Sequence, residues 1–194
     1  MSFLLSLSRF IDALNEKIGH GVSWALVLAV LICSGNAMIR YAFNMSSNAW
    51  LEIQWYLFSA IFLLGSSYTL RRNEHVRIDV VVGRFSKRTQ VWIDLFGFLI
   101  FMLPATLLIL YYAIPYAWIS IQSQEVSSNA GGLIVWPAKL LIPVSFFLLT
   151  LQGISELIKR IGYLMGKVAA SEFEKQATTP EEEIEAIKAA NKLN

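Results

Sequence analysis

The sequence predicts an all-α integral membrane protein with four transmembrane helices and both termini in the cytoplasm. Three observations predict this class. The 194 residues are 56% hydrophobic and only 15% charged, whereas soluble domains average about 25% charged residues. Four windows contain almost no charge and approach the roughly 20 residues that a membrane span needs. Most lysines and arginines lie in the segments that these windows place on one side of the membrane. The same composition excludes a disordered chain, which needs many charges and few apolar residues.

Residues 1–19 predict an amphipathic helix that lies on the inner membrane surface. Apolar side chains recur there at helical spacing, and polar side chains occupy the opposite face. The apolar set comprises Phe3, Leu7, Phe10, Ile11, Leu14 and Ile18. The first expected span follows at about 20–40. We expect this span to be retained, because its apolar window is longer than the core of a signal peptide.

The first expected span carries a stripe of small residues spaced four apart. Positions four apart form one ridge along a helix, so the stripe predicts a place where another backbone approaches closely. The spacing leaves open whether that neighbour belongs to this chain or to another subunit. The competing explanation is that alanine is common in membrane helices. The stripe consists of Gly21, Ala25, Ala29, Cys33 and Ala37.

The second expected span, 53–71, is bounded by Trp50 and Glu52 at one end and by Arg71 at the other. A carboxylate in the first turn of a helix complements the helix dipole, and tryptophan favours the membrane interface. Glu52 and Arg71 are separated by nineteen residues, or about 28 Å of helix. They therefore cannot pair with each other, and we expect them at opposite faces of the membrane.

A basic helical connection is expected between the second and third spans. Arg71, His75 and Asp79 lie four apart and share a face if the helix continues past the span. That face predicts either a bridge in which His75 joins Arg71 to Asp79 or a contact with a partner. The other basic residues of the connection are expected to anchor at lipid headgroups. This second group comprises Arg72, Arg84, Lys87 and Arg88.

The third expected span, 95–120, lies in an uncharged window of 30 residues. Because this window exceeds one span, we expect tilt, a kink at Pro104 or Pro115, or a final stretch outside the membrane core. The fourth expected span, 136–158, begins with a tryptophan and a proline. Lys139 lies one turn inside it, and we expect its ammonium group to snorkel to the outer surface.

The distribution of basic residues predicts the orientation. Fourteen of the sixteen lysines and arginines fall before the first span, between the second and third, or after the fourth. Arg40 and Lys139 are the two exceptions. The positive-inside rule then places both termini and the loop between the second and third spans in the cytoplasm. Residues 20–160 form the expected membrane domain, and 161–194 form a cytoplasmic tail, partly disordered or with a short helix.

The residue types argue against chemistry within the spans. His20 lies at the cytoplasmic end of the first span and His75 in the middle loop, so no pair of histidines faces each other inside the membrane to bind haem, and no histidine there can activate the intramembrane serines. Windows 53–70 and 95–124 contain no ionisable acid or base, which a proton relay or ion-coupling site normally needs. We therefore predict no enzymatic activity, no cofactor or metal in this chain, and no nucleic-acid partner.

Several short motifs appear in an order that resembles one transporter family. They are Asn-Ala-Trp-Leu-Glu at 48–52, Leu-Gly at 64–65, Arg-Arg-Asn-Glu-His-Val-Arg-Ile-Asp at 71–79, and the runs 136–143 and 151–156. Together they resemble the DctQ family, the small membrane subunit of tripartite ATP-independent periplasmic (TRAP) transporters. Members often carry two adjacent acids before the second helix, whereas here an isoleucine follows Glu52.

The resemblance implies a bacterial inner-membrane complex that imports organic acids by sodium-coupled symport. In such a complex a periplasmic binding protein delivers substrate to a large DctM-like membrane subunit, and sodium ions are expected in that large subunit. The small subunit is expected to be a non-catalytic scaffold surrounded by membrane lipids. Candidate interface residues are those of the small-residue stripe together with Trp50, Glu52, Arg71, His75, Asp79 and Lys139.

Two other functions remain open at this point. The chain could be the membrane-anchor subunit of a redox or other enzyme complex, which predicts a bound chromophore or quinone. It could also be a small exporter that works as a homo-oligomer, which predicts transport by this chain alone.

Overall fold

The computed structural model describes residues 2–45, 47–73, 84–170 and 173, and in these ranges the fold is helical. An isolated antiparallel bridge between Val126 and Ile134 is the one β contact in the described chain. The elements are α1 (Ser2–Phe43), α2 (Asn48–Arg71), α4 (Lys87–Phe96), the π-helical η1 (Gly97–Met102), α5 (Leu103–Gln122) and α6 (Trp136–Leu164).

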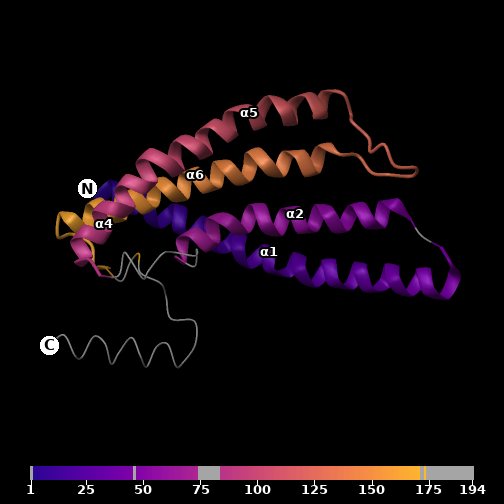
Figure 1. Cartoon of the computed structure of the whole chain (residues 1–194), viewed down its shortest axis with the longest axis horizontal. Coiled ribbons are helices and arrows are strands. Elements are labelled where there is room, and N and C mark those ends of the chain that lie inside the picture. The colour runs from indigo at the N-terminus through magenta and orange to yellow at the C-terminus, as the bar shows by residue number, and fades with distance from the viewer. Residues whose placement is uncertain (1, 46, 74–83, 171–172, 174–194) are drawn as a thin grey trace.

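The long helices form two antiparallel hairpins, α1 with α2 and α5 with α6 (Figure 1). Helix α6 packs against α1, α2 and α5, so it is the central helix, whereas α5 packs on α6 and η1. In the most apolar 18-residue stretch of α6, 50% of the residues are buried within the chain. In the most apolar stretch of α1, 6% are buried. The N-terminus of α1 and the C-terminal end of α6 lie at the same end of the molecule (Figure 1).

Among the described residues, three helices are long and apolar enough to cross a membrane: Ser2–Phe43, Lys87–Gln122 and Trp136–Leu164. They agree with three of the four expected spans. Helix α2 has 24 residues and occupies the expected position of the second span. That α2 also crosses the membrane, and that both termini face the cytoplasm, stay predictions.

Helix α1 is continuous, with no break between the expected surface helix at 1–19 and the expected span. Its 42 residues extend about 63 Å, roughly twice the thickness of a hydrocarbon core. The polar face of its N-terminal half turns inward: Ser8 and Asn15 are 1% and 0% exposed, whereas Phe3 and Phe10 are 76% and 67% exposed. The helix is amphipathic as predicted, but its polar face packs on α6.

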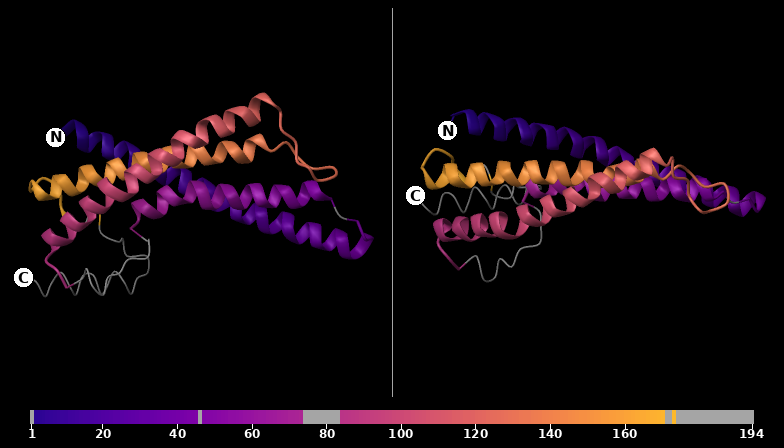
Figure 2. Two further views of the ribbon diagram at one scale, coloured as in Figure 1. Left: turned by 45° about the horizontal axis from the view of Figure 1, so that its top comes forward. Right: turned by 90° about the horizontal axis from the view of Figure 1, so that it is seen from above.

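The third expected span belongs to a longer helix that begins at Lys87. Ser86 caps it, because its hydroxyl accepts a hydrogen bond from the Thr89 backbone N–H at 3.3 Å. The π-helical η1 ends at Met102, two residues before Pro104, which has no N–H for the usual helical bond to a carbonyl four residues earlier. The helix changes direction between α4 and α5 (Figure 2). Of the expected alternatives, the structure shows the kink near a proline.

The small-residue stripe winds around α1. Each step of four residues turns about 40° beyond a full turn, so its members do not share one contact. Ala29 is completely buried within this chain and Ala25 is partly buried, whereas Gly21, Cys33 and Ala37 are exposed. Ala29 therefore packs within this chain. A role of Gly21, Cys33 and Ala37 at a partner interface stays a prediction.

Gly19 of α1 packs against the Tyr68 side chain of α2, and a methyl group at Gly19 is expected to destabilise the protein. A Cβ atom at Gly19 would clash with Cδ2 of Tyr68, and overpacking of this kind costs about 1–3 kcal/mol. Gly21 is the matched control, because a Cβ there meets nothing within 4 Å. Thermal unfolding should show a lower melting temperature for Gly19→Ala and none of this loss for Gly21→Ala. Equal melting temperatures would contradict the packing at Gly19.

Candidate functional site

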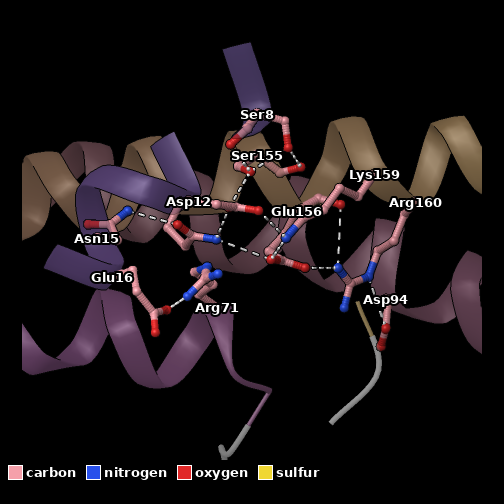
Figure 3. Close-up of polar contacts among 11 residues, drawn as sticks. Ser8, Asp12, Asn15, Glu16, Arg71, Asp94, Ser155, Glu156, Lys159 and Arg160 are labelled. Atoms are coloured by element: carbon pink, nitrogen blue, oxygen red, sulfur yellow. Dashed lines mark hydrogen bonds and ion pairs between the residues drawn. The ribbon is translucent and has the colours of Figure 1, made fainter. Parts of the chain in front are cut away.

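A buried polar cluster lies where α1, α2, α4 and α6 meet (Figure 3). We use the name polar cluster for twelve residues. Four come from α1, five from α6, one from α4 and two from the end of α2. They are Ser8, Asp12, Asn15, Glu16, Gln152, Ser155, Glu156, Lys159, Arg160, Asp94, Arg71 and Arg72.

Hydrogen bonds join α1 to α6 along two complementary polar faces. The hydroxyl oxygens of Ser8 and Ser155 lie 2.7 Å apart. The Asn15 amide donates to Oε1 of Gln152 at 2.7 Å, and Gln152 donates to Oδ1 of Asp12 at 2.9 Å. Ser155 also donates to Oδ1 of Asp12, at 2.8 Å. These bonds satisfy most polar groups of the interface, so the two helices can pack closely. Oδ1 of Asn15 is a buried acceptor that has no hydrogen-bond donor among the described residues.

Three charged side chains of α6 form the centre of the cluster. Glu156, Lys159 and Arg160 are 2%, 2% and 1% exposed. The Glu156 carboxylate pairs with both Lys159 and Arg160. Lys159 also reaches Oδ2 of Asp12 at 3.1 Å, and Nε of Arg160 reaches Oδ2 of Asp94 at 3.0 Å. These ion pairs connect α6 to α1 on one side and to α4 on the other.

The end of α2 joins the cluster through Glu16. Arg71 forms an ion pair with Glu16, and Nη2 of Arg72 lies 3.0 Å from Oε1 of the same carboxylate. The Arg72 guanidinium also lies 5.0 Å from the centre of the Tyr68 ring. Arg72 therefore has a carboxylate partner within the chain, and its expected contact with lipid headgroups stays a prediction.

Two members of the expected polar face cannot be compared with the structure. His75 and Asp79 lie outside the described residues, so the bridge from Arg71 through His75 to Asp79 stays a prediction. The structure shows that Arg71 turns toward Glu16 of α1.

The formal charges of the polar cluster cancel. It contains four acids, Asp12, Glu16, Asp94 and Glu156, and four bases, Arg71, Arg72, Lys159 and Arg160. A buried ion needs an opposite charge and hydrogen bonds to offset the loss of its hydration. Among the described residues no group of three or more histidines, cysteines or acids could hold a metal ion. The arrangement can hold helices together, and its carboxylates are already paired with bases.

A second polar site closes the opposite end of the molecule. Glu52, 4% exposed, accepts hydrogen bonds from the loop between α5 and α6. The donors are the backbone N–H of Leu133 at 2.6 Å, the Ser127 hydroxyl at 2.5 Å and the Asn129 amide at 2.9 Å. These bonds, the one from Leu133 above all, lower the pKa of the Glu52 carboxyl. Glu52 therefore holds the loop between α5 and α6 against the start of α2. We call it the outer loop, because the predicted orientation puts it at the outer face.

Lys139 and Trp50 complete the comparison with the expected interface residues. Nζ of Lys139 lies 2.5 Å from Oε2 of Glu125 and 4.3 Å from the centre of the Tyr116 ring. The hydrogen bond from Lys139 lowers the pKa of the Glu125 carboxyl. Trp50 is exposed. Contacts of Trp50, Glu52 and Lys139 with a partner stay predictions, since this is the structure of a single chain.

Glu52→Gln is expected to release the outer loop. A glutamine side chain lacks the negative charge that attracts the three loop donors. Its NH2 group is itself a donor, so it cannot accept a hydrogen bond from the loop. Hydrogen exchange at the Leu133 amide should become about ten-fold faster. Glu125→Gln is the control, because it leaves all three Glu52 bonds in place. Unchanged exchange in Glu52→Gln would refute the assignment.

Protonation should reproduce the effect of that substitution. Because the pKa of Glu52 is lowered in the folded protein, its carboxylate stabilises the loop fully above the ordinary glutamate range. This stabilisation is lost as the pH falls through the lowered value.

Sequence reasoning missed the polar cluster as a unit. The available signal was two polar stripes at helical spacing, Ser8-Asp12-Asn15 on α1 and Gln152-Ser155-Lys159 on α6. A polar stripe inside a membrane span predicts a buried partner. Applied to α6, that rule indicates a buried partner but does not say which helix supplies it.

The family comparison matches most of the chain. The family model described as "Tripartite ATP-independent periplasmic transporters, DctQ component" matches residues 20–162. This range includes the α2, α4 and α6 residues of the polar cluster and the outer loop, but not the α1 residues of the cluster. No curated protein and no solved structure matches the chain.

Proposed function

Because the chain belongs to the DctQ family, the small permease component of TRAP transporters, we propose that it is a scaffold for the large membrane subunit. In this proposal the complex sits in a bacterial inner membrane and imports organic acids by sodium-coupled symport. A periplasmic binding protein supplies the substrate to the large subunit, which holds the sodium ions. The chain itself carries no enzymatic activity and no cofactor.

The observation that carries the scaffold role is the placement of charge. Windows 53–70 and 95–124 contain no ionisable acid or base. At the two ends of the helices, Glu52 is held by loop donors and Glu156 by two bases. An ion-coupling site needs polar or ionisable groups that can change partners near the middle of the membrane. The buried charged groups described in this chain pair with one another or with loop donors, and they fix its own helices.

The exposed surface of α5 supports a partner in the membrane. Because α5 packs on α6 and η1, most of its circumference faces away from this chain. Its exposed side chains include Leu108, Tyr111, Ile114 and Trp118. Membrane helices associate through such surfaces by close packing instead of charge. We assign this surface to lipid and to the large subunit.

Co-expression with the large subunit tests the proposal. We expect the two proteins to copurify in mild detergent, and we expect sodium-driven uptake in proteoliposomes to need both of them and the binding protein. This chain alone should give no flux. Failure to copurify together with full uptake in its absence would overturn the scaffold role, and flux through this chain alone would favour the exporter.

The redox-anchor alternative receives no support. The family match points to a transporter component, and the part of the chain that is described holds no cluster of metal ligands.

A further inference from the structure

A small basic pocket lies beside the polar cluster, between the N-terminal end of α1 and the C-terminal end of α6. Its volume is about 190 Å³, and it is lined by Leu5, Ser8, Arg9, Lys159, Lys167 and Val168. Three of these six residues are cationic, and none is acidic. The pocket therefore offers a concentrated positive charge to a small ligand.

Two of the three cationic side chains in this pocket have no negatively charged partner among the described residues. The polar cluster is neutral, and Lys159 belongs to it. Arg9 and Lys167 are exposed and have no acidic partner within the described ranges. Lys159 uses two of its three N–H donors on Asp12 and Glu156, which leaves one donor for a ligand. The pocket thus combines two unbalanced charges with a rigidly held ammonium group.

The depth of the pocket matches that of lipid headgroups. Lys159 follows Trp136 by 23 residues, or about 35 Å of helix, compared with about 30 Å for a hydrocarbon core. With Trp136 at the outer interface, Lys159 lies just beyond the opposite edge of the core. The opposite face of this part of α1 exposes apolar side chains, Phe3, Leu4, Leu7 and Phe10. Cations at headgroup depth on an amphipathic helix suit a ligand with an anionic head and an acyl tail.

We propose that this pocket binds a phosphate group and that an anionic phospholipid supplies it. The guanidinium of Arg9 and the ammonium groups of Lys159 and Lys167 provide charge-assisted hydrogen bonds to the phosphate oxygens. In this proposal the acyl chains extend from the pocket into the hydrocarbon core. Because Lys159 also pairs with Asp12 and Glu156, the bound lipid contacts the polar cluster directly. This inference does not depend on the proposed function.

Lipid titration of the full-length chain in detergent tests the proposal. The probes are short-chain phosphatidylglycerol, short-chain phosphatidylcholine and inorganic phosphate, with binding measured by native mass spectrometry. We expect one phosphatidylglycerol per chain, bound about ten-fold more tightly than either other probe. Equal binding of inorganic phosphate would overturn the lipid as its source. Equal binding of phosphatidylcholine would overturn the requirement for an anionic lipid.

Arg9→Gln and Lys167→Gln should each weaken phosphatidylglycerol binding about five-fold. Both side chains are exposed, so the fold should tolerate these changes. Lys17→Gln is the matched control, because it removes one exposed cation from α1 outside the pocket. The control should bind like the unchanged chain. An equal loss in all three variants, or no loss in Arg9→Gln and Lys167→Gln, would overturn the proposed site.

Discussion

Glu156→Gln is expected to cause the largest loss of stability of any single substitution considered for this protein. Glu156 pairs with Lys159 and Arg160, and all three side chains are at most 2% exposed. Removing the carboxylate leaves two bases with one acid fewer in a buried site, and breaking a buried ion pair in this way costs about 3–5 kcal/mol. We expect a much lower melting temperature and a poor yield of monodisperse protein.

A charge-balanced double variant separates electrostatics from packing. Glu156→Gln with Lys159→Gln removes one charge of each sign, so the cluster stays neutral. The double variant should regain a large part of the stability that Glu156→Gln loses. A Glu156→Gln protein that melts like the unchanged chain would contradict the account of the cluster.

Arg160→Lys is expected to have the next largest effect. Nε of Arg160 reaches Asp94 on α4 at 3.0 Å while Nη1 pairs with Glu156 on α6. The guanidinium also lies 4.7 Å and 5.2 Å from the rings of Phe98 and Phe173. A lysine ammonium is a single point charge that cannot reach two separate carboxylates and stack on rings. From these contacts we expect a loss of about 2–4 kcal/mol.

Hydrogen exchange along α4 measures the effect of Arg160→Lys locally. Amides of α4 should exchange faster because its ion pair with α6 is weakened. Arg88→Lys on the exposed side of α4 is the control and should leave exchange unchanged. If α4 exchanges equally in both variants, Arg160 does not fasten α4 to α6.

The positions of the helices could be predicted because apolar windows end at charged residues. The expected spans 53–71, 95–120 and 136–158 fall within α2, the α4–α5 helix and α6. The early start of the third helix depends on the cap at Ser86, a local feature that a hydropathy window does not detect. The family was also recognised from motif order, and the family match confirms it.

The polar cluster could not be predicted from the same reasoning, because an amphipathic pattern does not say which side its polar face meets. The polar face of 1–19 was assigned to the membrane surface, yet Asp12 pairs with Lys159, 147 residues away. The positive-inside rule counts Lys159 and Arg160 as cytoplasmic bases. It does not distinguish a buried base from an exposed one. Partners so distant in sequence become visible only when α1 and α6 are placed side by side.

At the outer end, the sequence located Glu52 and Lys139 but not their internal contacts. Both were expected to meet partners, whereas the structure shows Glu52 bound by Leu133 and Lys139 paired with Glu125. The loop donors come from a segment without helical periodicity, so no spacing rule links them to α2. The position of a charged residue near the end of a span therefore does not predict which residue it pairs with.

As a scaffold, this chain should keep α1 and α6 together throughout transport. A cross-link between the two helices tests this most directly. The hydroxyls of Ser8 and Ser155 lie 2.7 Å apart, so Ser8→Cys with Ser155→Cys should form a disulfide on oxidation, with Cys33→Ser removing the single native cysteine. Uptake would be measured in proteoliposomes with the large subunit and the binding protein. We predict that the oxidised complex transports as fast as the reduced one. Loss of uptake on oxidation, with recovery on reduction, would show that α1 and α6 must move apart and would contradict the scaffold role.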